Sequence, residues 1–318
     1  MDGMITEKTV KNRIGRRKKE IHKGDCGRIL IAAGSWGMAG AAILAARAAL
    51  RAGAGLVRLA IPEELFPIVQ VGVPEATCIR RSLSNLDLTA CDAVCAGPGL
   101  GEGEESIALI TKLLESCEKT LVIDADGLNI IAHQELFGLL QRRQARFPMR
   151  TILTPHMGEA GRLLGADFPP RTDLHSSEVR LGIAQALTEK TGAIVVLKGA
   201  GTLVAAPGMQ AYTNTTGNPG MATGGSGDVL SGIITGLAGQ KLQDAGTESP
   251  AAADGEADIC AKSLNNDGRM GAWDAALCGV YIHGLAGDLA AQELGEYGVT
   301  AGDLALYTAY ALKQLCGG

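Results

Sequence analysis

The sequence predicts an α/β fold in which a mostly parallel central sheet is flanked by helices on both faces. Short apolar runs, typical of buried strands, alternate along the chain with Ala-rich or amphipathic segments of helical period. Of the 318 residues, 46% are hydrophobic but only 3% are aromatic, so Ala and Gly must fill much of the interior. We therefore expect one layered domain in which helices pack closely on the sheet.

The predicted strands are apolar at nearly every position, as parallel strands are when both of their faces are buried. They are Arg28–Ala32, Leu56–Ile61, Ala93–Ala96, Thr120–Asp124, Thr151–Leu153, Ile194–Leu197 and Thr202–Ala205. Ligands of open parallel sheets bind beyond the carboxyl ends of the strands. The residues that follow these strands are therefore the first candidates for a functional site.

The segments between and after the strands predict helices, because their apolar residues recur at helical spacing or because they are rich in Ala. They are Ala39–Ala52, Glu104–Cys117, Gly158–Leu164, Ser177–Thr191, Gly225–Gly239, Trp273–Ala290 and Ala301–Leu315. The last three follow one another with little strand character between them, so the chain is expected to end in a group of helices.

Composition divides the chain into three parts. Residues 1–21 include the basic stretch Arg16–Lys19 and predict a solvated basic N-terminal arm. Residues 22–318 predict a single domain. Within it, residues 241–271 are rich in Ala, Asp, Gly, Ser and Asn and show no period, which indicates a surface excursion.

Charge and cysteine usage exclude several classes of protein. A formal net charge of −5 argues against a nucleic-acid-binding protein. No apolar run approaches the ~20 residues that a membrane span needs, so no membrane association is expected. None of the eight cysteines forms a C-x-x-C motif, and unpaired thiols suit a reducing compartment. These observations predict a cytoplasmic protein.

The stretch NPGMATGGSGDVLSG, from Asn218 to Gly232, begins the helix predicted after Gly225. The free N–H groups and the dipole at a helix N-terminus bind anions, and glycine allows a phosphate to approach the backbone closely. Asp228 lies in the first turn, where it could simply complement the helix dipole. Alternatively, it could take a proton from a substrate hydroxyl while the helix terminus holds the phosphate that is attacked.

Other glycine-rich stretches have more than one explanation. GPGLG at Gly97–Gly101 follows a strand and is compatible with an ordinary turn between a strand and a helix. KGAGT at Lys198–Thr202 lies between two strands, where a hairpin turn or a phosphate-binding loop would each explain it. The stretch Gly53–Gly55 closes a helix instead of opening one, so a C-terminal cap explains it best.

Polar residues at two other strand ends could bind a metal ion or cap a helix. Asp124 ends one predicted strand, and His156 and Glu159 follow another. Asp124 and Glu159 could hold Mg²⁺, because magnesium uses a few carboxylates together with phosphate oxygens. The alternative for His156 is a turn residue before a helix, and for Glu159 a capping role.

Eight segments, taken in order, resemble the ADP/ATP-dependent NAD(P)H-hydrate dehydratases of the ribokinase-like superfamily. They are HKGDCG, AAGSWGMAGAAILAARAALRAGAGLV, AGPGLG, VIDADGLN, ILTPHMGEAGRLLG, VVLKGAGTLVAAP, NPGMATGGSGDVLSGIITGL and GVYIHGLAGDLAA. The resemblance implies a ribokinase-like fold. It also implies that the S epimer of NADH or NADPH, hydrated at C6 of the nicotinamide ring, is dehydrated while a nucleotide is hydrolysed, with Mg²⁺ as cofactor.

The same resemblance implies roles for individual positions. Asp228 would be the base and would also contact the hydrated dinucleotide. The other positions implied to contact that substrate are Ala41, Gly99 and His156, and those implied to bind the nucleotide are Lys198, Gly199, Ala200, Gly201, Thr202 and Gly227. His156 stands where related enzymes have Asn in an N-x-x-E motif associated with Mg²⁺, so a substrate contact is expected for it instead of a metal contact.

The resemblance also implies an oligomeric state, a separate partner enzyme and a co-substrate. Members of the family often form tetramers, so a homo-oligomer is expected. Bifunctional relatives carry an N-terminal epimerase domain, and we expect that activity on a separate chain. ADP is expected as co-substrate in preference to ATP, because Thr215–Asp228 contains no Lys or Arg. The alternative functions are a ribokinase-like kinase of a small molecule such as a vitamin precursor, and a nucleotide-binding sensor without activity.

Overall fold

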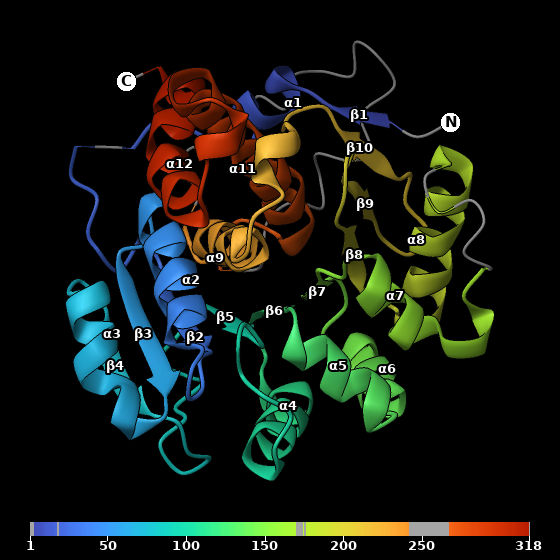
Figure 1. Cartoon of the computed structure of the whole chain (residues 1–318). Coiled ribbons are helices and arrows are strands. Elements are labelled where there is room, and N and C mark those ends of the chain that lie inside the picture. Colours follow the sequence, from blue (N-terminus) through green and yellow to red (C-terminus); the bar gives the residue numbers. More distant parts are fainter. Residues whose placement is uncertain (1–2, 18, 170–173, 175, 242–266, 318) are drawn as a thin grey trace.

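The described part of the chain forms a ten-stranded sheet with helices on both of its faces (Figure 1). The computed structural model describes residues 3–17, 19–169, 174, 176–241 and 267–317. Within these residues every strand except β9 runs in the same direction. The predicted mostly parallel α/β fold is confirmed.

The strands are short, and most are buried along their whole length. They are β1 (Gly3–Ile5), β2 (Arg28–Ala32), β3 (Leu56–Ile61), β4 (Thr77–Arg80), β5 (Ala93–Ala96), β6 (Thr120–Ile123), β7 (Thr151–Leu153), β8 (Ile194–Leu197), β9 (Leu203–Ala205) and β10 (Tyr212–Asn214). All seven predicted strands are present, and the predicted bounds differ from the observed ones by at most one residue.

The helices form two groups. One group lies on the face that Figure 1 shows enclosed by the curved sheet: α2 (Ala39–Arg51), α9 (Ser226–Ala238), α11 (Ala272–Leu294) and α12 (Ala301–Cys316), with the short α1 (Glu7–Lys11) against α11 and α12. The other group covers the opposite face: α4 (Glu104–Ser116), α5 (Asp126–His133), α6 (Phe137–Arg146), α7 (Met157–Leu164) and α8 (Ser177–Thr191). Helix α3 (Phe66–Gly72) packs beside α2 and β4.

Alternate residues of each central strand face the two helical layers. In β2, Ile29 and Ile31 belong to the core shared with α2, α9, α11 and α12, whereas Leu30 and Ala32 belong to the core on the other face. This period of two follows from strand geometry. It explains why the strands carry apolar residues at consecutive positions.

The strand order is β1-β10-β9-β8-β7-β6-β5-β2-β3-β4. The chain therefore builds outward from β2 through β3 to β4, and in the opposite direction from β5 to β9. The loops that follow β2 and β5 consequently leave the sheet in different directions. Such a switch point leaves a crevice at the carboxyl ends of the strands, where ligands of α/β sheets bind.

Small residues allow α9 to pack closely on α2. A β-carbon added at Gly232 would lie 2.2 Å from the carbonyl oxygen of Ala45, and one added at Gly236 would lie 2.8 Å from that of Ala49. The two backbones are therefore in contact along two turns. This contact explains why Ala and Gly, instead of aromatic residues, fill the interior.

The predicted N-terminal arm is corrected in its first half. Residues Gly3–Ile5 form β1, which pairs in parallel with β10 at the edge of the sheet, and Ile5 and Val10 are fully buried. Burial of these apolar side chains fixes a segment whose composition is otherwise polar. The basic residues Arg16 and Arg17 remain exposed, as the sequence predicted.

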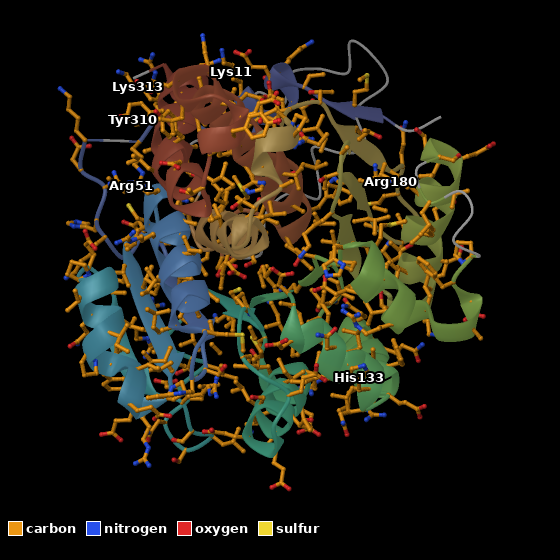
Figure 2. All side chains as sticks on the ribbon, in the orientation of Figure 1. Lys11, Arg51, His133, Arg180, Tyr310 and Lys313 are labelled. Carbon is orange, nitrogen blue, oxygen red and sulfur yellow. The ribbon has the colours of Figure 1, made fainter. Side chains whose placement is uncertain are left out.

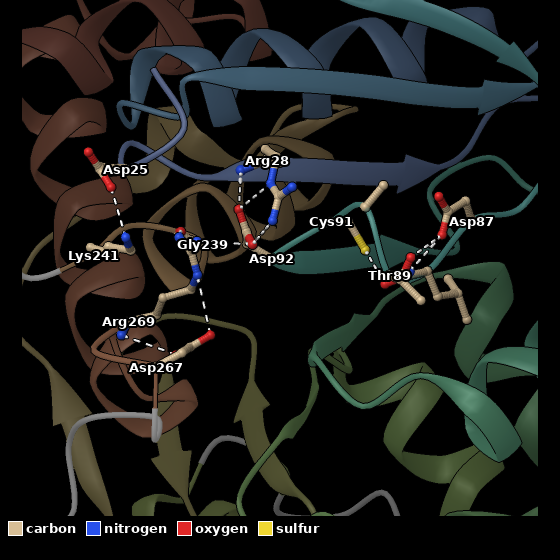
Figure 3. A network of polar contacts seen from close by, with 12 residues as sticks. Asp25, Arg28, Asp87, Thr89, Cys91, Asp92, Gly239, Lys241, Asp267 and Arg269 are labelled. Carbon is tan, nitrogen blue, oxygen red and sulfur yellow. Dashed lines mark hydrogen bonds and ion pairs between the residues drawn. The ribbon is translucent and has the colours of Figure 1, made fainter. Parts of the chain in front are cut away.

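The predicted excursion at 241–271 is described only at its ends, because residues 242–266 lie outside the described residues. Lys241 and Arg269 form an antiparallel bridge. Arg269 also forms an ion pair of 3.0 Å with the buried Asp92, which Arg28 contacts at 2.9 Å (Figure 3). Lys241 in turn forms an ion pair of 2.9 Å with Asp25, so charge-assisted contacts hold both ends of the segment near the amino end of β2.

Among the helices of the described chain, none has both the length and the apolar character of a membrane-spanning segment. The long helix α11 owes its apolar composition to burial among α9, α12 and the sheet.

Gly232→Ala should destabilise the fold, because its new methyl group would overlap the backbone of α2. Overpacking of this kind costs about 1–3 kcal/mol. Gly182→Ala on α8 is the matched control: nothing lies within 4 Å of its added β-carbon, so helix propensity should stabilise the protein by up to ~1 kcal/mol. Urea denaturation of both variants measures the difference, and equal stabilities would contradict the backbone contact.

Candidate active site

The loops after β2 and β5 meet at the switch point of the sheet. The backbone N–H of Gly34 donates to the carbonyl of Pro98 at 2.8 Å. Gly99 has φ 58°, and a β-carbon there would lie 2.9 Å from Cβ of Ala41. The structure therefore brings Ala41 and Gly99, two predicted substrate contacts, together at the N-terminus of α2.

A strained backbone presents two carboxylates after β6. Ala125 has φ 47°, which is unusual for a residue with a β-carbon. On one side of it Asp124 is buried, and on the other Asp126 accepts a hydrogen bond of 2.7 Å from the N–H of Gly101. Gly97 has no β-carbon to block this turn; one added there would lie 1.8 Å from the carbonyl oxygen of Asp124.

Lys198 at the end of β8 pairs with Asp124 across β7. Its Nζ lies 2.7 Å from Oδ1 of Asp124 and 3.6 Å from Oε2 of Glu159. Burial by itself would lower the pKa of Lys198, but the two carboxylates outweigh burial and raise it. Lys198 is therefore a positive charge fixed at the carboxyl edge of the sheet.

Asp228 lies in the first turn of α9, beside this charged cluster. Gly225 caps the helix in the left-handed conformation, with φ 90°. A β-carbon added at Gly227 would lie 3.2 Å from Nζ of Lys198 and 3.7 Å from Oδ2 of Asp124, so all three groups border one space. Burial first, and then repulsion from Asp124, raise the pKa of Asp228 to about 7.

A carboxylate with a pKa of about 7 can accept a proton near neutral pH. A carboxylate that only complements a helix dipole needs no such raised pKa. The N–H of Ser226 donates to the carbonyl of Thr223 at 3.3 Å, so the N–H groups of Gly227 and Asp228 are the ones at the start of α9 that suit an anion next to it. The arrangement is therefore suited to removing a proton from a substrate hydroxyl beside a bound phosphate.

His156 and Glu159 form a capping box at the start of α7. Nδ1 of His156 accepts hydrogen bonds from the N–H groups of Gly158 and Glu159, and Oε2 of Glu159 accepts one of 2.8 Å from the N–H of His156. Burial lowers the pKa of His156. The capping alternative is thus what the structure contains, although the exposed His156 ring still faces solvent; a substrate contact for it stays a prediction.

The stretch KGAGT forms the hairpin between the antiparallel strands β8 and β9. Gly199 and Gly201 have φ 149° and 61°, which a residue with a side chain rarely adopts. Arg180 of α8 donates to the carbonyl of Ala200, while its Nη2 is buried without a hydrogen-bond partner. Sequence analysis did not point to Arg180, because α8 approaches this hairpin only in the fold.

A second residue that the sequence analysis missed lies behind the helix terminus. His283 of α11 is buried, and its Nε2 lies 3.4 Å from Oγ of Ser226, the first residue of α9. Burial lowers the pKa of His283 to about 4, so the ring is neutral near pH 7. It supports the start of α9 without adding a charge. In the sequence, the only indication of a role for His283 was its place in the motif GVYIHGLAGDLAA.

The predicted magnesium ligands fit a cation unequally. Oδ2 of Asp124 is buried without a hydrogen-bond partner and faces the space beside Gly227, whereas both oxygens of Glu159 lie near His156 or Lys198. Asp124 is therefore the better candidate. The described residues contain no group of three metal-binding side chains.

Comparison with known proteins identifies the family to which this site belongs. A family model described as NAD(P)H-hydrate dehydratase matches residues 29–309. The chain belongs to the NAD(P)H-hydrate dehydratase family. The matched range spans the elements from β2 to α11 that form the site.

Individual relatives agree with this assignment. The chain is 37% identical to a bifunctional NAD(P)H-hydrate repair enzyme of Moorella thermoacetica over 98% of its own length and 54% of that relative. It is 40% identical to the enzyme of that name from Coxiella burnetii, over 91% of this chain and 51% of the relative. The chain thus spans about half the length of the curated relatives it matches.

A solved structure matches the whole fold. The ADP/ATP-dependent NAD(P)H-hydrate dehydratase of Bacillus subtilis, co-crystallised with ATP and Mg²⁺, is 26% identical, covers 99% of both chains and superposes with a TM-score of 0.75. A ribokinase-like superfamily protein of Enterococcus faecalis, 23% identical, also matches 99% of this chain and 97% of its own with a TM-score of 0.77. The ribokinase-like architecture predicted from the sequence is therefore confirmed.

Asp228→Asn should stabilise the folded protein at pH 8 by roughly 1–3 kcal/mol. Because the pKa of Asp228 is raised to about 7 from 3.8, the folded protein retains this proton after the unfolded chain has lost it. The stability contributed by Asp228 therefore falls as pH rises from about 4 to 7, and the gain in the variant should vanish near pH 4. Denaturation midpoints from pH 4 to 8 measure it, with the exposed Asp167→Asn as control. An equal gain in the free energy of unfolding at pH 4 and at pH 8 would contradict the raised pKa of Asp228.

Proposed function

We propose that this chain dehydrates the S epimer of C6-hydrated NADH and NADPH back to NADH and NADPH, and that the reaction is coupled to hydrolysis of ADP to AMP and phosphate. The observation that carries the proposal is the carboxyl of Asp228, with its pKa raised to about 7, at the N-terminus of α9. Membership of the dehydratase family supports the same reaction.

Asp228 acts as the base in the first step. It removes the proton from the C6 hydroxyl as that oxygen attacks the terminal phosphorus of ADP, and AMP leaves. The N–H groups of Gly227 and its neighbours hold the transferred phosphate. The lone pair of the ring nitrogen then expels phosphate from C6, and loss of a proton from C5 restores the double bond of the dihydronicotinamide.

Lys198 and the hairpin after β8 hold the nucleotide. Lys198 stays protonated because Asp124 and Glu159 raise its pKa, so it can neutralise charge that develops on the phosphates. The hairpin from Gly199 to Thr202 presents its backbone to the nucleotide without large side chains. Mg²⁺ would be held by Asp124, with Glu159 as the weaker candidate, and would neutralise phosphate charge when bound.

The hydrated dinucleotide occupies the switch point next to this cluster. Gly99 packs directly on α2, because a β-carbon there would lie 2.9 Å from Cβ of Ala41 and 3.0 Å from Cβ of Met38, and the two small residues would present a surface without large side chains to the nicotinamide ring. His156 lies at the rim, at the start of α7. We propose these three residues, together with Asp228, as the substrate contacts.

Other expectations from the sequence stay predictions: a homotetramer, a cytoplasmic location and an epimerase on a separate chain. The alternative of a small-molecule kinase is not favoured, because the matching family model is that of a dehydratase. Both enzymes would use the helix terminus and Asp228 alike, so the assay below separates them by product.

The decisive experiment incubates the purified protein with hydrated NADH, ADP and Mg²⁺ and follows recovery of NADH absorbance. Asp228→Asn should lower this rate by ~10²–10⁴-fold, because it removes the general base. ADP binding should change little, since the backbone groups that hold the phosphates remain. Turnover within a few-fold of the wild type would assign Asp228 only to the helix dipole, and absence of NADH recovery in the wild type would refute the function.

ADP should support faster turnover than ATP at matched Mg²⁺. A third phosphate would add negative charge near Asp124, Glu159 and Asp228, and Lys198 is already paired with two of these carboxylates. The stretch Thr215–Asp228 supplies no Lys or Arg to offset it. Parallel assays with the two nucleotides, free of adenylate kinase, measure the ratio, and faster turnover with ATP would reverse this assignment alone.

A further inference from the structure

A hollow lies at the amino end of the sheet, opposite the candidate active site. Its volume is about 440 Å³, which is within the range of small-molecule sites. Asp25 and Cys26 line it just before β2, Ala52 and Gly53 line it before β3, and Gln240 lines it just after α9. No residue proposed above for catalysis or binding is among those that line it.

The floor of this hollow is apolar and its rim is basic. Ile14, Ile21, Leu237, Met270 and Leu312 contribute apolar surface. Five cationic side chains border them: Arg16, Arg17, Arg51, Lys241 and Lys313. In a chain of net charge −5, a cluster of five cations with one carboxylate at its edge is unusual. Figure 2 shows Arg51 and Lys313 on one side of the molecule.

Few of these cations are neutralised by a carboxylate. Lys241 forms an ion pair of 2.9 Å with Asp25, which Figure 3 shows. Arg16 and Arg17 donate to uncharged acceptors, the carbonyls of Gly317 and Gly53. Among the described residues, the side chains of the remaining two, Arg51 and Lys313, have no hydrogen-bond or ion-pair partner.

The negative ends of helix dipoles offset only part of this positive charge. The C-termini of α2, α9 and α12 all reach the hollow, and each carries about half a negative charge, roughly 1.5 charges together. Together with Asp25 they offset about half of the five positive charges. An excess of about two to three positive charges remains above an apolar floor, which is close to the charge of one or two phosphate groups.

We propose that this hollow binds a nucleotide-sized organic phosphate, with its apolar part on the floor and its phosphates between Arg51 and Lys313. Both α2 and α9 extend from this hollow to the candidate active site, where they carry Ala41 and Asp228 at their other ends. The two sites are therefore separate, and both can be filled at the same time.

Calorimetric titration of the full chain with ADP and Mg²⁺ tests the proposal. The expectation of a first site rests on the proposed function. The wild type should bind two ADP per chain. In the double variant Arg51→Ala, Lys313→Ala one site should be unchanged, and the affinity of the other for ADP should fall at least tenfold. The matched control is the double variant Lys112→Ala, Arg142→Ala, which removes the same charge from two exposed positions on α4 and α6, so two sites should remain.

Gly201→Val separates the two sites. Its branched side chain should block the hairpin after β8 and leave only the site at the amino end, while Gly208→Val, at another positive φ with open space around it, should leave both. If the wild type binds one ADP, and Gly201→Val abolishes this binding while the double variant Arg51→Ala, Lys313→Ala retains it, the site at the amino end is refuted. Two ADP unaffected by that double variant, or no binding at all, would also overturn it. One ADP that only the double variant removes would support this site and refute the proposed nucleotide site.

Discussion

The buried ion pair between Lys198 and Asp124 is the interaction on which the site depends. It joins the ends of β8 and β6 across β7, with 17% of the lysine side chain and 1% of the aspartate side chain exposed. The pair places one positive and one negative charge in a space that water scarcely reaches. Every neighbouring titratable group therefore responds to them more strongly than it would at the surface.

Asp228 shows the consequence most clearly. Helix dipoles stabilise a carboxylate in a first turn and would lower its pKa, but burial and the charge of Asp124 raise the pKa of Asp228 to about 7. The balance favours the proton because Lys198 is already paired. His283 supports the same helix end from behind as a neutral ring, so it does not compensate for the carboxylates.

Close packing of α9 on α2 connects the candidate active site with the opposite end of the sheet. Gly232 and Gly236 let the backbone of α9 touch that of α2, so the two helices form a pair that extends from one end of the sheet to the other. One end presents helix N-termini to a cluster of carboxylates and one lysine. The other end presents helix C-termini to a cluster of arginines and lysines. The direction of the helices in a parallel α/β fold explains both halves, since positive and negative dipole ends collect at opposite edges of the sheet.

The sequence by itself determined the central strands and helices, because strands buried on both faces must be apolar throughout and helices must repeat their apolar positions. It also indicated the glycines of the α9 terminus and the hairpin after β8. Only the tertiary structure decided the edge strand β1, because Ile5 and Val10 are buried although the sequence around them is polar. It also decided that Arg180 contacts the hairpin after β8 and that His283 lies beside the start of α9. It also decided the raised pKa of Asp228, since a pKa depends on charges that the fold brings from β6 and β8, far away along the chain.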